Sequence, residues 1–317
     1  MEIGSFIELQ LPKGNELYQG DSVVRLNTGR AAIWHSFRLT GAKRLWLPYY
    51  LCESVKEFLQ KKNVKLAFYH INHSLLPVEE FVPDDDDAVL VVNYFGIFSH
   101  RTIEHVCMRF KHPVVDNSHA FFNEPVEFAY NVYSCRKFIG VADGAYCIGR
   151  NSGMFIEHYQ QGRSFSTAIH LLERIDLGLN DETYRHKKMN DARLDFEDCM
   201  VMSKLTHKIL DGTDYEHIKK KRKENFFTAV DLFSDVNEFR FTISDDVVPM
   251  VYPLVVSDDS LLDRMHAINH FQGHWWEYLT KSCDKNTVEY HMSRYVIPVT
   301  IDQRYGRKEL ELIRSVI

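Results

Sequence analysis

The sequence predicts an α/β protein: a larger part built on a mostly parallel sheet, followed by a smaller α+β part. Short apolar segments alternate with segments of helical spacing through the first half of the chain. The apolar segments have few polar interruptions, which is typical of strands buried on both faces. After about residue 155 the chain becomes more polar and more helical. Alternation of strands and helices indicates a parallel sheet covered by helices.

The predicted strands of the larger part are rich in aliphatic and aromatic residues. They span residues 44–48, 66–71, 88–96, 112–118, 129–134 and 144–149. Helical spacing occupies residues 29–41, 53–63 and 100–111. Ligands of such sheets bind beyond the carboxyl ends of the strands, so candidate site residues are expected there.

The second half of the chain predicts fewer strands. We expect a helical region over residues 195–212, a helix over 215–233 and a strand over 247–256. A helix over 260–272, a strand over 293–301 and a closing helix over 306–317 should follow. No linker rich in proline or glycine separates the two halves. We therefore expect a large domain over residues 1–200, packed closely against a small domain over residues 201–317.

Charge argues against a nucleic-acid surface. The net charge is -6 and the pI is about 6.2, whereas nucleic-acid-binding domains are normally basic. The one basic run, Lys219–Lys223, lies in a predicted helix and is interpreted as a solvated face. Four consecutive aspartates at 84–87 are interpreted as a solvated turn rather than a metal site, because neighbouring side chains diverge.

The spacing of the cysteines and the absence of long apolar runs indicate the cellular compartment of the protein. The six cysteines show no CxxC spacing, which disfavours a zinc site, and a chain of this size rarely depends on disulfides. The first residues lack a basic segment followed by a long apolar one, and no apolar run reaches the roughly 18 residues that span a bilayer. We expect a cytoplasmic protein with small-molecule partners and no membrane or nucleic-acid partner.

The first candidate site segment is Asn27–Ile33, which opens a predicted helix with glycine and small residues. Free N–H groups at a helix start bind phosphate, and Gly29 allows close approach. Arg30 offers a charge-assisted hydrogen bond, and Ala31 continues the small-residue turn. An ordinary N-cap at this position remains an alternative.

The second segment is Val114–Ala120. Asp116 stands at the expected carboxyl end of a buried strand, where an unpaired carboxylate is costly. A helix N-cap is the alternative role for it. His119, three residues later, is either in contact with the same ligand or a core histidine.

The third segment follows the next strand, which ends at Ser134. Lys137 stands between two apolar segments, where a surface turn is the simpler interpretation. Burial and the neighbouring Arg136 would favour its neutral form. A neutral amine attacks carbonyl groups and forms Schiff bases.

Together the three segments predict a pyridoxal phosphate site. The helix start and Ser134 would hold the phosphate, and Asp116 would keep the pyridine nitrogen protonated, which makes the ring an electron sink. Lys137 would carry the cofactor as a Schiff base. The order of phosphate loop, aspartate and lysine along the chain supports this assignment.

At these residues the chain resembles the DegT/DnrJ/EryC1/StrS family of sugar aminotransferases, which have the fold type I architecture of PLP-dependent enzymes. The resemblance runs roughly from residue 23 to the end. It is carried by several segments of the sequence: GRAAI (29–33), LPYYLCESV (47–55), VDNSH (115–119), SCRKFIGVADGA (134–145), KENF (223–226), VYPLVV (251–256), HWWEYL (274–279) and YVIPVTIDQRY (295–305).

The resemblance implies a homodimer with its active site at the subunit interface. It implies amino transfer, commonly from L-glutamate, to a keto sugar carried on a nucleotide, within sugar or polysaccharide biosynthesis. It places Asp116 on the pyridine nitrogen and His119 near the ring hydroxyl, and Lys137 would move a proton between donor and acceptor carbons.

The chain departs from the family at two places. Near LPYYLCESV the family has an aromatic residue or histidine against the cofactor ring; here Cys52 aligns, and Tyr50 is the nearest aromatic residue. The segment that gives an asparagine to the partner's phosphate is not recognisable, although Asn190 lies in the corresponding region.

Three other functions remain open as alternatives. One is a non-catalytic relative that serves as a binding or regulatory protein, suggested by the missing cross-subunit segment. Another is a dehydratase of the same fold, in which histidine replaces the lysine; Lys137 argues against it. The third is a nucleotide enzyme of the Rossmann type, but no GxGxxG follows an early strand.

Overall fold

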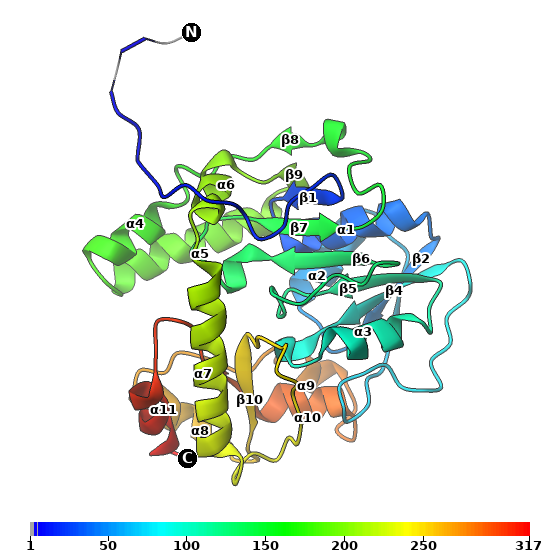
Figure 1. Ribbon diagram of the computed structural model, residues 1–317. Helices are drawn as coiled ribbons and strands as arrows, with labels where there is room; N and C mark the ends of the chain where they lie inside the picture. Colours follow the sequence, from blue (N-terminus) through cyan, green and yellow to red (C-terminus); the bar gives the residue numbers. More distant parts are fainter. Residues whose placement is uncertain (1–2, 5) are drawn as a thin grey trace.

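The computed structural model describes residues 3–4 and 6–317, and it contains two sheets of unequal size (Figure 1). The larger sheet has nine strands in the order β3-β2-β4-β5-β6-β7-β1-β9-β8. The smaller sheet pairs β10 with β11. Figure 1 shows the large sheet in the upper part of the molecule and the small sheet with the C-terminal helices below it.

The strands of the large sheet are short and mostly buried. Their bounds are β1 (Val23–Leu26), β2 (Arg44–Pro48), β3 (Leu66–Tyr69), β4 (Asp87–Val92), β5 (His112–Asp116), β6 (Tyr130–Ser134), β7 (Ala145–Ile148), β8 (Gln160–Gln161) and β9 (Met200–Val201). The five strands from β3 to β6 in this order pair in parallel, while β7 is antiparallel to both of its neighbours. The predicted mostly parallel sheet is confirmed, and its central strand β4 is buried along its whole length.

The helices of the larger part cover this sheet and line its edges. They are α1 (Gly29–Thr40), α2 (Glu53–Lys61), α3 (His100–Cys107), α4 (Ile169–Asp176), α5 (Asp181–Phe196) and α6 (Lys204–Asp211). Helix α1 packs on β5, β6 and β7, and α3 packs on β4 and β5. The two helices α4 and α5 pack on each other and stand out at the left of Figure 1.

The four-aspartate segment at 84–87 is a turn held by ion pairs. Asp87 is buried and accepts hydrogen bonds from Arg44 and from the indole of Trp46 at 2.7 Å. Asp86 pairs with Lys43 at 2.5 Å. The turn therefore fixes the start of β4 against β2, and only part of it is solvated as predicted.

The helical region predicted over residues 195–212 is wrong in its middle. The chain leaves α5, forms the short strand β9 and then enters α6. The backbone N–H of Asn27 donates to Met200 at 2.9 Å, and Met202 donates to Arg25 at 3.1 Å. Strand β1 offers an open edge, and pairing with that edge outweighs the local helical pattern.

The segment after residue 200 stays with the large sheet before the chain crosses to the small part. The carboxylate of Asp143, which follows the turn after β6, accepts from the backbone N–H of Ser203 at 2.8 Å and from its hydroxyl at 2.7 Å. The expected boundary at residue 200 therefore falls inside a hydrogen-bonded unit, and α6 packs with the larger part.

The small part consists of α7 (Tyr215–Phe233), β10 (Val251–Val255), α8 (Leu261–Ala267), α9 (Leu279–Ser282), α10 (Val288–Tyr295), β11 (Val296–Thr300) and α11 (Arg307–Arg314). Helix α7 packs on β10 and α11 and runs from the large sheet to the bottom of the molecule (Figure 1). The predicted elements of this part are present with shifted ends, and α9 and α10 were not predicted.

The basic run Lys219–Lys223 is not uniformly solvated. Arg222 is buried; it donates to the carbonyl of Met250 at 2.8 Å and lies 4.4 Å from the centre of the Phe138 ring. Burial lowers the pKa of Arg222 to about 10. Because Phe138 belongs to the larger part and Met250 precedes β10, this arginine connects the two parts.

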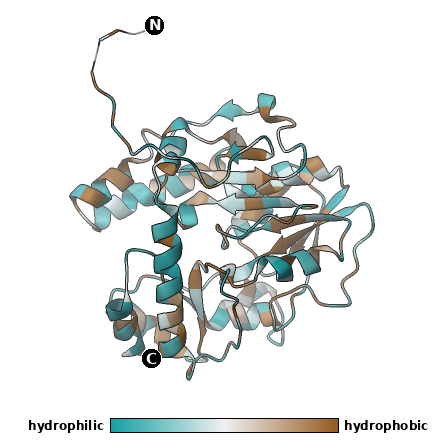
Figure 2. Ribbon diagram, viewed as in Figure 1, coloured by the Kyte–Doolittle hydropathy of each residue, from teal (hydrophilic) through white to brown (hydrophobic). Residues whose placement is uncertain are grey.

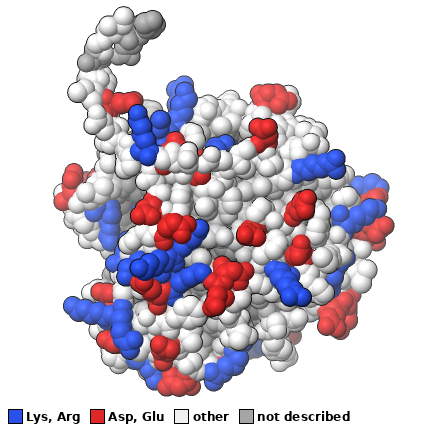
Figure 3. Space-filling view, viewed as in Figure 1, with Lys and Arg blue, Asp and Glu red and all other residues white. Residues whose placement is uncertain are grey.

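The outer surface carries charges of both signs. Figure 3 shows basic and acidic side chains interspersed across the visible face. Among the described residues, no helix combines the length and the apolar character that crossing a bilayer requires.

Candidate active site

A cavity of about 240 Å³ opens where the ends of β5 and β6 meet the start of α1. Its wall comes from six segments of the larger part and one residue of the smaller part. The residues on it are Thr28, Gly29, Arg30, Ile33, Leu51, Cys52, Ser54, Val55, Val92, Asp116, Ser118, His119, Ser134, Arg136, Lys137, Asp191, Asp195 and Trp276.

The start of α1 forms one end of this cavity. Thr28 is the N-cap, and its hydroxyl accepts from the N–H of Ala31 at 3.2 Å. The N–H groups of Gly29 and Arg30 precede the first helical hydrogen bonds and are free to bind an anion. A Cβ on Gly29 would lie 3.2 Å from the hydroxyl of Ser118, so a larger residue would crowd this end of the cavity.

Two arginines face the same end. Arg30 has its Nη1 atom 2.7 Å from Asp195 of α5, and its Nε atom is buried without a hydrogen-bond partner. Arg136 pairs with Asp191, also of α5. Helix starts, hydroxyls and guanidinium groups are the donors that proteins use for phosphate, so this end suits an anion. We call it the anion cradle: Thr28, Gly29, Arg30, Ser118, Ser134 and Arg136.

Asp116 and Ser134 end neighbouring strands, and parallel pairing brings both ends to the same edge of the sheet. Both side chains are buried. The Asp116 carboxylate accepts from the N–H of Ser118 at 2.9 Å, which fixes its orientation. An aspartate held in this way faces the cavity with an acceptor oxygen left over.

Lys137 closes a single turn of 3-10 helix, Cys135–Lys137, directly after β6. Its side chain lines the cavity and is exposed there. Desolvation lowers the pKa of Lys137; the charges of Asp116 and Cys52 oppose this effect, and Arg136 adds to it. Because the pKa is lowered overall, more of the Lys137 amine is neutral and nucleophilic than in an ordinary lysine.

His119 is a fixed, neutral imidazole. Burial, and then the charge of Lys137, lower the pKa of His119 well below its ordinary value. The N–H of Phe95 donates to its Nδ1 atom at 3.3 Å, so Nε2 carries the hydrogen and is a donor. The ring also packs against Trp275, with centroids 4.7 Å apart.

The segment Asn93–Ile97 holds this histidine from behind. Phe95 and Gly96 have φ of 58° and 74°, and they form a 3-10 turn where the sequence predicted the end of a strand. A Cβ on Gly96 would lie 2.1 Å from the carbonyl oxygen of His119. Only glycine allows the two backbones to approach this closely.

Trp276 brings the small part to the cavity. Its ring is nearly parallel to that of His119, with 13° between planes and 6.2 Å between centroids. Its φ is 57°, which is uncommon outside glycine and is found where the surrounding packing imposes it. The sequence singled out HWWEYL as part of the small domain only, and no local pattern indicated that Trp276 would reach this cavity.

The predicted site residues Gly29, Arg30, Asp116, His119, Ser134 and Lys137 all line the cavity. Ala31 does not, because it is fully buried in α1. Tyr50 does not either: its ring points into the core and meets Trp276 edge-on, with centroids 4.4 Å apart. Cys52 and Leu51 lie on the wall instead.

Asn190 has a role within its own chain. Its amide donates to the carbonyl of Ala142 at 2.9 Å and accepts from Arg193 at 3.0 Å. The bond to Ala142 holds α5 against the loop after β6, and the bond from Arg193 lies within the helix. The side chain is therefore not available to a partner subunit in this arrangement.

Sequence reasoning also missed Asp191, Asp195 and Ser118 as wall residues, whereas Arg136 was expected beside Lys137. The first two lie more than 50 residues from Lys137 on α5, of which only the last two residues fell inside the predicted helical region. Ser118 was visible only as part of the segment that contains Asp116.

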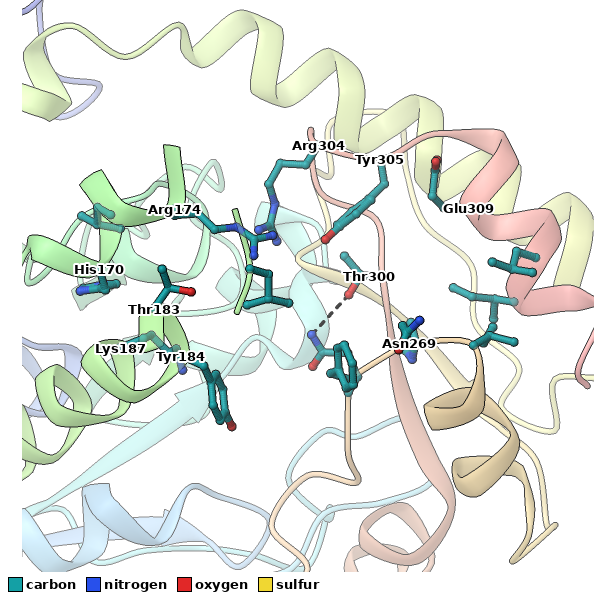
Figure 4. Close-up of a pocket in the computed structure, with 18 residues that line it drawn as sticks. His170, Arg174, Thr183, Tyr184, Lys187, Asn269, Thr300, Arg304, Tyr305 and Glu309 are labelled. Atoms are coloured by element: carbon teal, nitrogen blue, oxygen red, sulfur yellow. Dashed lines mark hydrogen bonds between the residues drawn. The ribbon is translucent and has the colours of Figure 1, made fainter. Parts of the chain in front are cut away.

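A second, larger cavity of about 520 Å³ lies between α4 and α5 on one side and the C-terminal part on the other (Figure 4). Its wall carries basic and aromatic side chains: His170, Arg174, Tyr184, Lys187, His270, Phe271, Arg304 and Tyr305. Lys187 forms an ion pair of 2.8 Å with Asp191, which lines the first cavity. Helix α5 therefore borders both cavities.

Two groups of described residues bring three metal-type ligand atoms together, namely Glu16, His207 and Asp211, and Glu173, Glu182 and His186. None of them lines the cavity around Lys137. In both groups a histidine is bonded to a carboxylate, which accounts for the geometry as ion pairs.

Solved structures share this fold at low sequence identity. Sugar aminotransferase CalS13 from Micromonospora echinospora is 13% identical, with 93% of this chain and 86% of that chain covered and a TM-score of 0.58. A DegT DnrJ EryC1 StrS aminotransferase from Brucella abortus is 10% identical, covering 93% and 84%, with a TM-score of 0.60. GDP-4-keto-6-deoxy-D-mannose-3-dehydratase from E. coli, with bound hydrated PLP, is 14% identical, covering 93% and 87%, with a TM-score of 0.63.

At identities this low the likeness establishes the fold of the chain. The fold expected from the sequence, that of PLP-dependent enzymes of fold type I, is confirmed. No protein-family model matches the chain, and no curated protein matches it in sequence. What the chain does therefore has to be argued from its own site.

Proposed function

We propose that this chain is a pyridoxal-phosphate-dependent aminotransferase that moves an amino group to the carbonyl carbon of a keto sugar. One observation carries the proposal: a lysine of lowered pKa, a fixed aspartate and an anion cradle line a single cavity. A cofactor that presents an aldehyde, a ring nitrogen and a phosphate needs these three groups together.

The residues present fit this cofactor. The buried Nε of Arg30 has no partner in the chain, and Gly29 leaves room beside the hydroxyl of Ser118. The cradle would hold the phosphate, with Ser134 adding a hydroxyl from the end of β6. When bound, the cofactor supplies an aldehyde that takes up the donor's amino group and a ring that accepts electrons from the carbon being deprotonated.

Lys137 supplies the chain's nucleophile and its mobile proton. A neutral amine attacks a carbonyl carbon, and after release it takes a proton from one carbon and returns it to another. Desolvation, which lowers the pKa of Lys137, prepares it for both roles. A histidine here would lack the first role, so the lysine favours amino transfer over the dehydratase chemistry named for the E. coli relative.

Asp116 and His119 act on the ring from two positions. The carboxylate of Asp116 would hold a proton on the ring nitrogen, which strengthens the ring as an electron acceptor. His119, with its hydrogen on Nε2, would donate to the ring oxygen. Because its pKa is far below the ordinary value, it stays a donor of fixed tautomer at neutral pH.

The second cavity suits the anionic end of an amino acceptor, whose carbonyl carbon would have to reach Lys137 in the first cavity. Arg174, Lys187 and Arg304 place basic groups on its wall, where Lys187 also pairs with Asp191 and Arg304 with Asp302, and Tyr184 offers a ring face (Figure 4). Phe271 adds a second aromatic ring to the wall. A sugar linked to a nucleotide carries both a diphosphate and a flat base. We therefore infer a nucleotide-linked keto sugar as acceptor, with L-glutamate as the amino donor, for a role in sugar or polysaccharide biosynthesis.

The apolar surface of α4 and its flanking segments supports a homodimer. Figure 2 shows hydrophobic residues on α4, at the left of the molecule and away from the sheet. The exposed side chains are Phe165, Ile169, Leu172, Ile175, Leu177 and Leu179. An exposed apolar area of this kind marks an interaction surface.

The free cysteines suit a reducing compartment, and we propose the cytoplasm.

The test is covalent capture of the cofactor. We expect the purified chain, mixed with pyridoxal phosphate and reduced with borohydride, to carry the cofactor's mass on the peptide that contains Lys137. Lys137→Ala should lose this label, and Lys65→Ala, which removes an exposed lysine, should keep it. L-glutamate should convert the loaded wild type to the pyridoxamine form, seen as a change in visible absorption, and the variant should give no conversion.

Two results would contradict the proposal. Equal labelling of Lys137→Ala and wild type would remove the lysine from the mechanism. A wild-type chain that takes up no cofactor would instead support the non-catalytic relative considered from the sequence.

A further inference from the structure

The arginines of the anion cradle already have negatively charged partners within the chain. Asp195 lies 2.7 Å from Arg30, and Asp191 pairs with Arg136. The two aspartates are one turn apart on α5, and both line the cavity around Lys137. Two carboxylates therefore stand where an anionic ligand of the cradle would bind.

Burial differs between the partners of the Arg30–Asp195 pair. The Arg30 side chain is 10% exposed, whereas that of Asp195 is 55% exposed. The Nε atom of Arg30 is buried and has no partner. The arginine is therefore fixed in the wall and still has an N–H group free to donate a hydrogen bond. The aspartate is accessible to water, so breaking its ion pair with Arg30 costs little free energy.

Like charges make joint occupancy unfavourable. A phosphate ester carries close to two negative charges at neutral pH, and the cavity is small and partly desolvated. Phosphate and carboxylate compete for the same guanidinium groups, and phosphate accepts more hydrogen bonds from them. The carboxylates of α5 therefore oppose an incoming phosphate until they move away.

We propose that Asp191 and Asp195 are internal substitutes for the cofactor phosphate, which displaces them from Arg136 and Arg30 and thereby releases the C-terminal turns of α5. This inference rests on the proposed function, since it concerns the same cradle. It assigns a regulatory contact: the chain without cofactor holds α5 closed over its own site.

The release is local because α5 has other anchors. Asn190 bonds to Ala142, the N-cap Asn180 closes a capping box, and His186 bonds to Glu173 of α4 at 2.8 Å. These contacts keep the helix on the large part. Exchange at Asp191 and Asp195 therefore loosens only the turns that follow Asn190.

The contact also links the two cavities. Lys187 bonds to Asp191 and lines the second cavity, so loss of the Asp191–Arg136 pair changes the charge balance there. By thermodynamic reciprocity, whatever favours the released form of α5 in one cavity favours it in the other. Because Asp191 keeps its bond to Lys187, loss of its Arg136 partner makes the second cavity less favourable for an anion.

The experiment compares Asp191→Asn and Asp195→Asn with wild type in the full chain without cofactor. Calorimetry would measure dissociation constants for inorganic phosphate and for pyridoxal phosphate. We expect each variant to bind both ligands about five-fold tighter or more, because a competitor is removed. Asp195→Ser, which removes the same charge, should behave like Asp195→Asn.

Asp181→Asn is the matched control, because Asp181 is exposed at the start of the same helix and does not line the cavity. It should leave both constants unchanged. Hydrogen exchange gives a second measurement: phosphate should speed amide exchange over residues 190–196 in wild type, and should have less effect in the double variant Asp191→Asn/Asp195→Asn.

Unchanged or weaker binding by the asparagine variants would overturn the inference, since the aspartates would then orient the arginines for the ligand. In that case wild type still binds pyridoxal phosphate, and the proposed function stands. If neither wild type nor any variant binds it, both the inference and the proposed function fail.

Discussion

At the scale of single residues, two charged neighbours act on the amine of Lys137 in opposite directions. Desolvation lowers the pKa of Lys137, the charge of Asp116 raises it, and the charge of Arg136 lowers it. Removing a negative neighbour favours the neutral amine, and removing a positive neighbour favours the charged one.

Asp116→Asn should therefore shift the reactivity of Lys137 to lower pH, and Arg136→Gln should shift it to higher pH. Reductive methylation with formaldehyde, measured at Lys137 by mass spectrometry across a pH series, follows the neutral amine directly. The midpoint should move in opposite directions for the two variants. Arg101→Gln, which alters an exposed residue of α3, should not move it.

Movement of both midpoints in the same direction would show that the variants act through rearrangement of the cavity and not through charge. Loss of labelling at every pH would mean that Lys137 is not accessible from the cavity.

At the scale of elements, the turn after β4 and the chain after β5 support each other. The N–H of Phe95 orients His119, and Gly96 lets the turn lie on the carbonyl group of His119. The N–H of Met250 also donates to the carbonyl of Phe95 at 2.8 Å, which connects the turn to the start of β10. The position of His119 thus depends on three segments.

Gly96→Ala should destabilise the protein by more than about 2 kcal/mol, because a clash with backbone adds to the cost of a positive φ. Gly178→Ala is the matched control: its φ is 70°, close to the 74° of Gly96, but a Cβ there meets nothing within 4 Å. It should cost only about 1–2 kcal/mol. Urea unfolding of both variants measures the difference.

Equal costs at the two glycines would show that the turn moves away from His119 without penalty. The fixed orientation of the imidazole would then need another explanation.

At the scale of the whole molecule, the homodimer proposal depends on the exposed apolar surface around α4. Ile175 is 81% exposed, and Leu172 lies one turn earlier on the same helix. The surface adjoins α5, whose other side lines the cavity around Lys137, so a partner there would lie close to the site.

We expect wild type to be a dimer in solution and the double variant Leu172→Glu/Ile175→Glu to be a monomer, because two charges would be buried in the interface. Light scattering after size-exclusion chromatography measures the mass. Val82→Glu, which alters an apolar residue that is equally exposed but lies in the loop before β4, should remain a dimer. A monomeric wild type would contradict the homodimer proposal.

The sequence by itself determined the central strands, the helices between them, and the positions of Asp116, Ser134 and Lys137 at strand ends. These features depend on local patterns: apolar runs, polar breaks, and the rule that parallel strands bring their carboxyl ends to one edge. Gly29 and Arg30 followed from the same logic, because a helix start is visible in the chain.

Only the tertiary structure decided which distant residues complete the cavity. Trp276 comes from the small part, and Asp191 and Asp195 come from a helix whose polar sequence gave no periodic signal. The aromatic ring of Tyr50 lies in the core, where it packs on Trp276, and Cys52 lines the cavity instead. Such choices depend on packing between segments far apart in the chain, and a local pattern carries no information about a partner that only folding brings near.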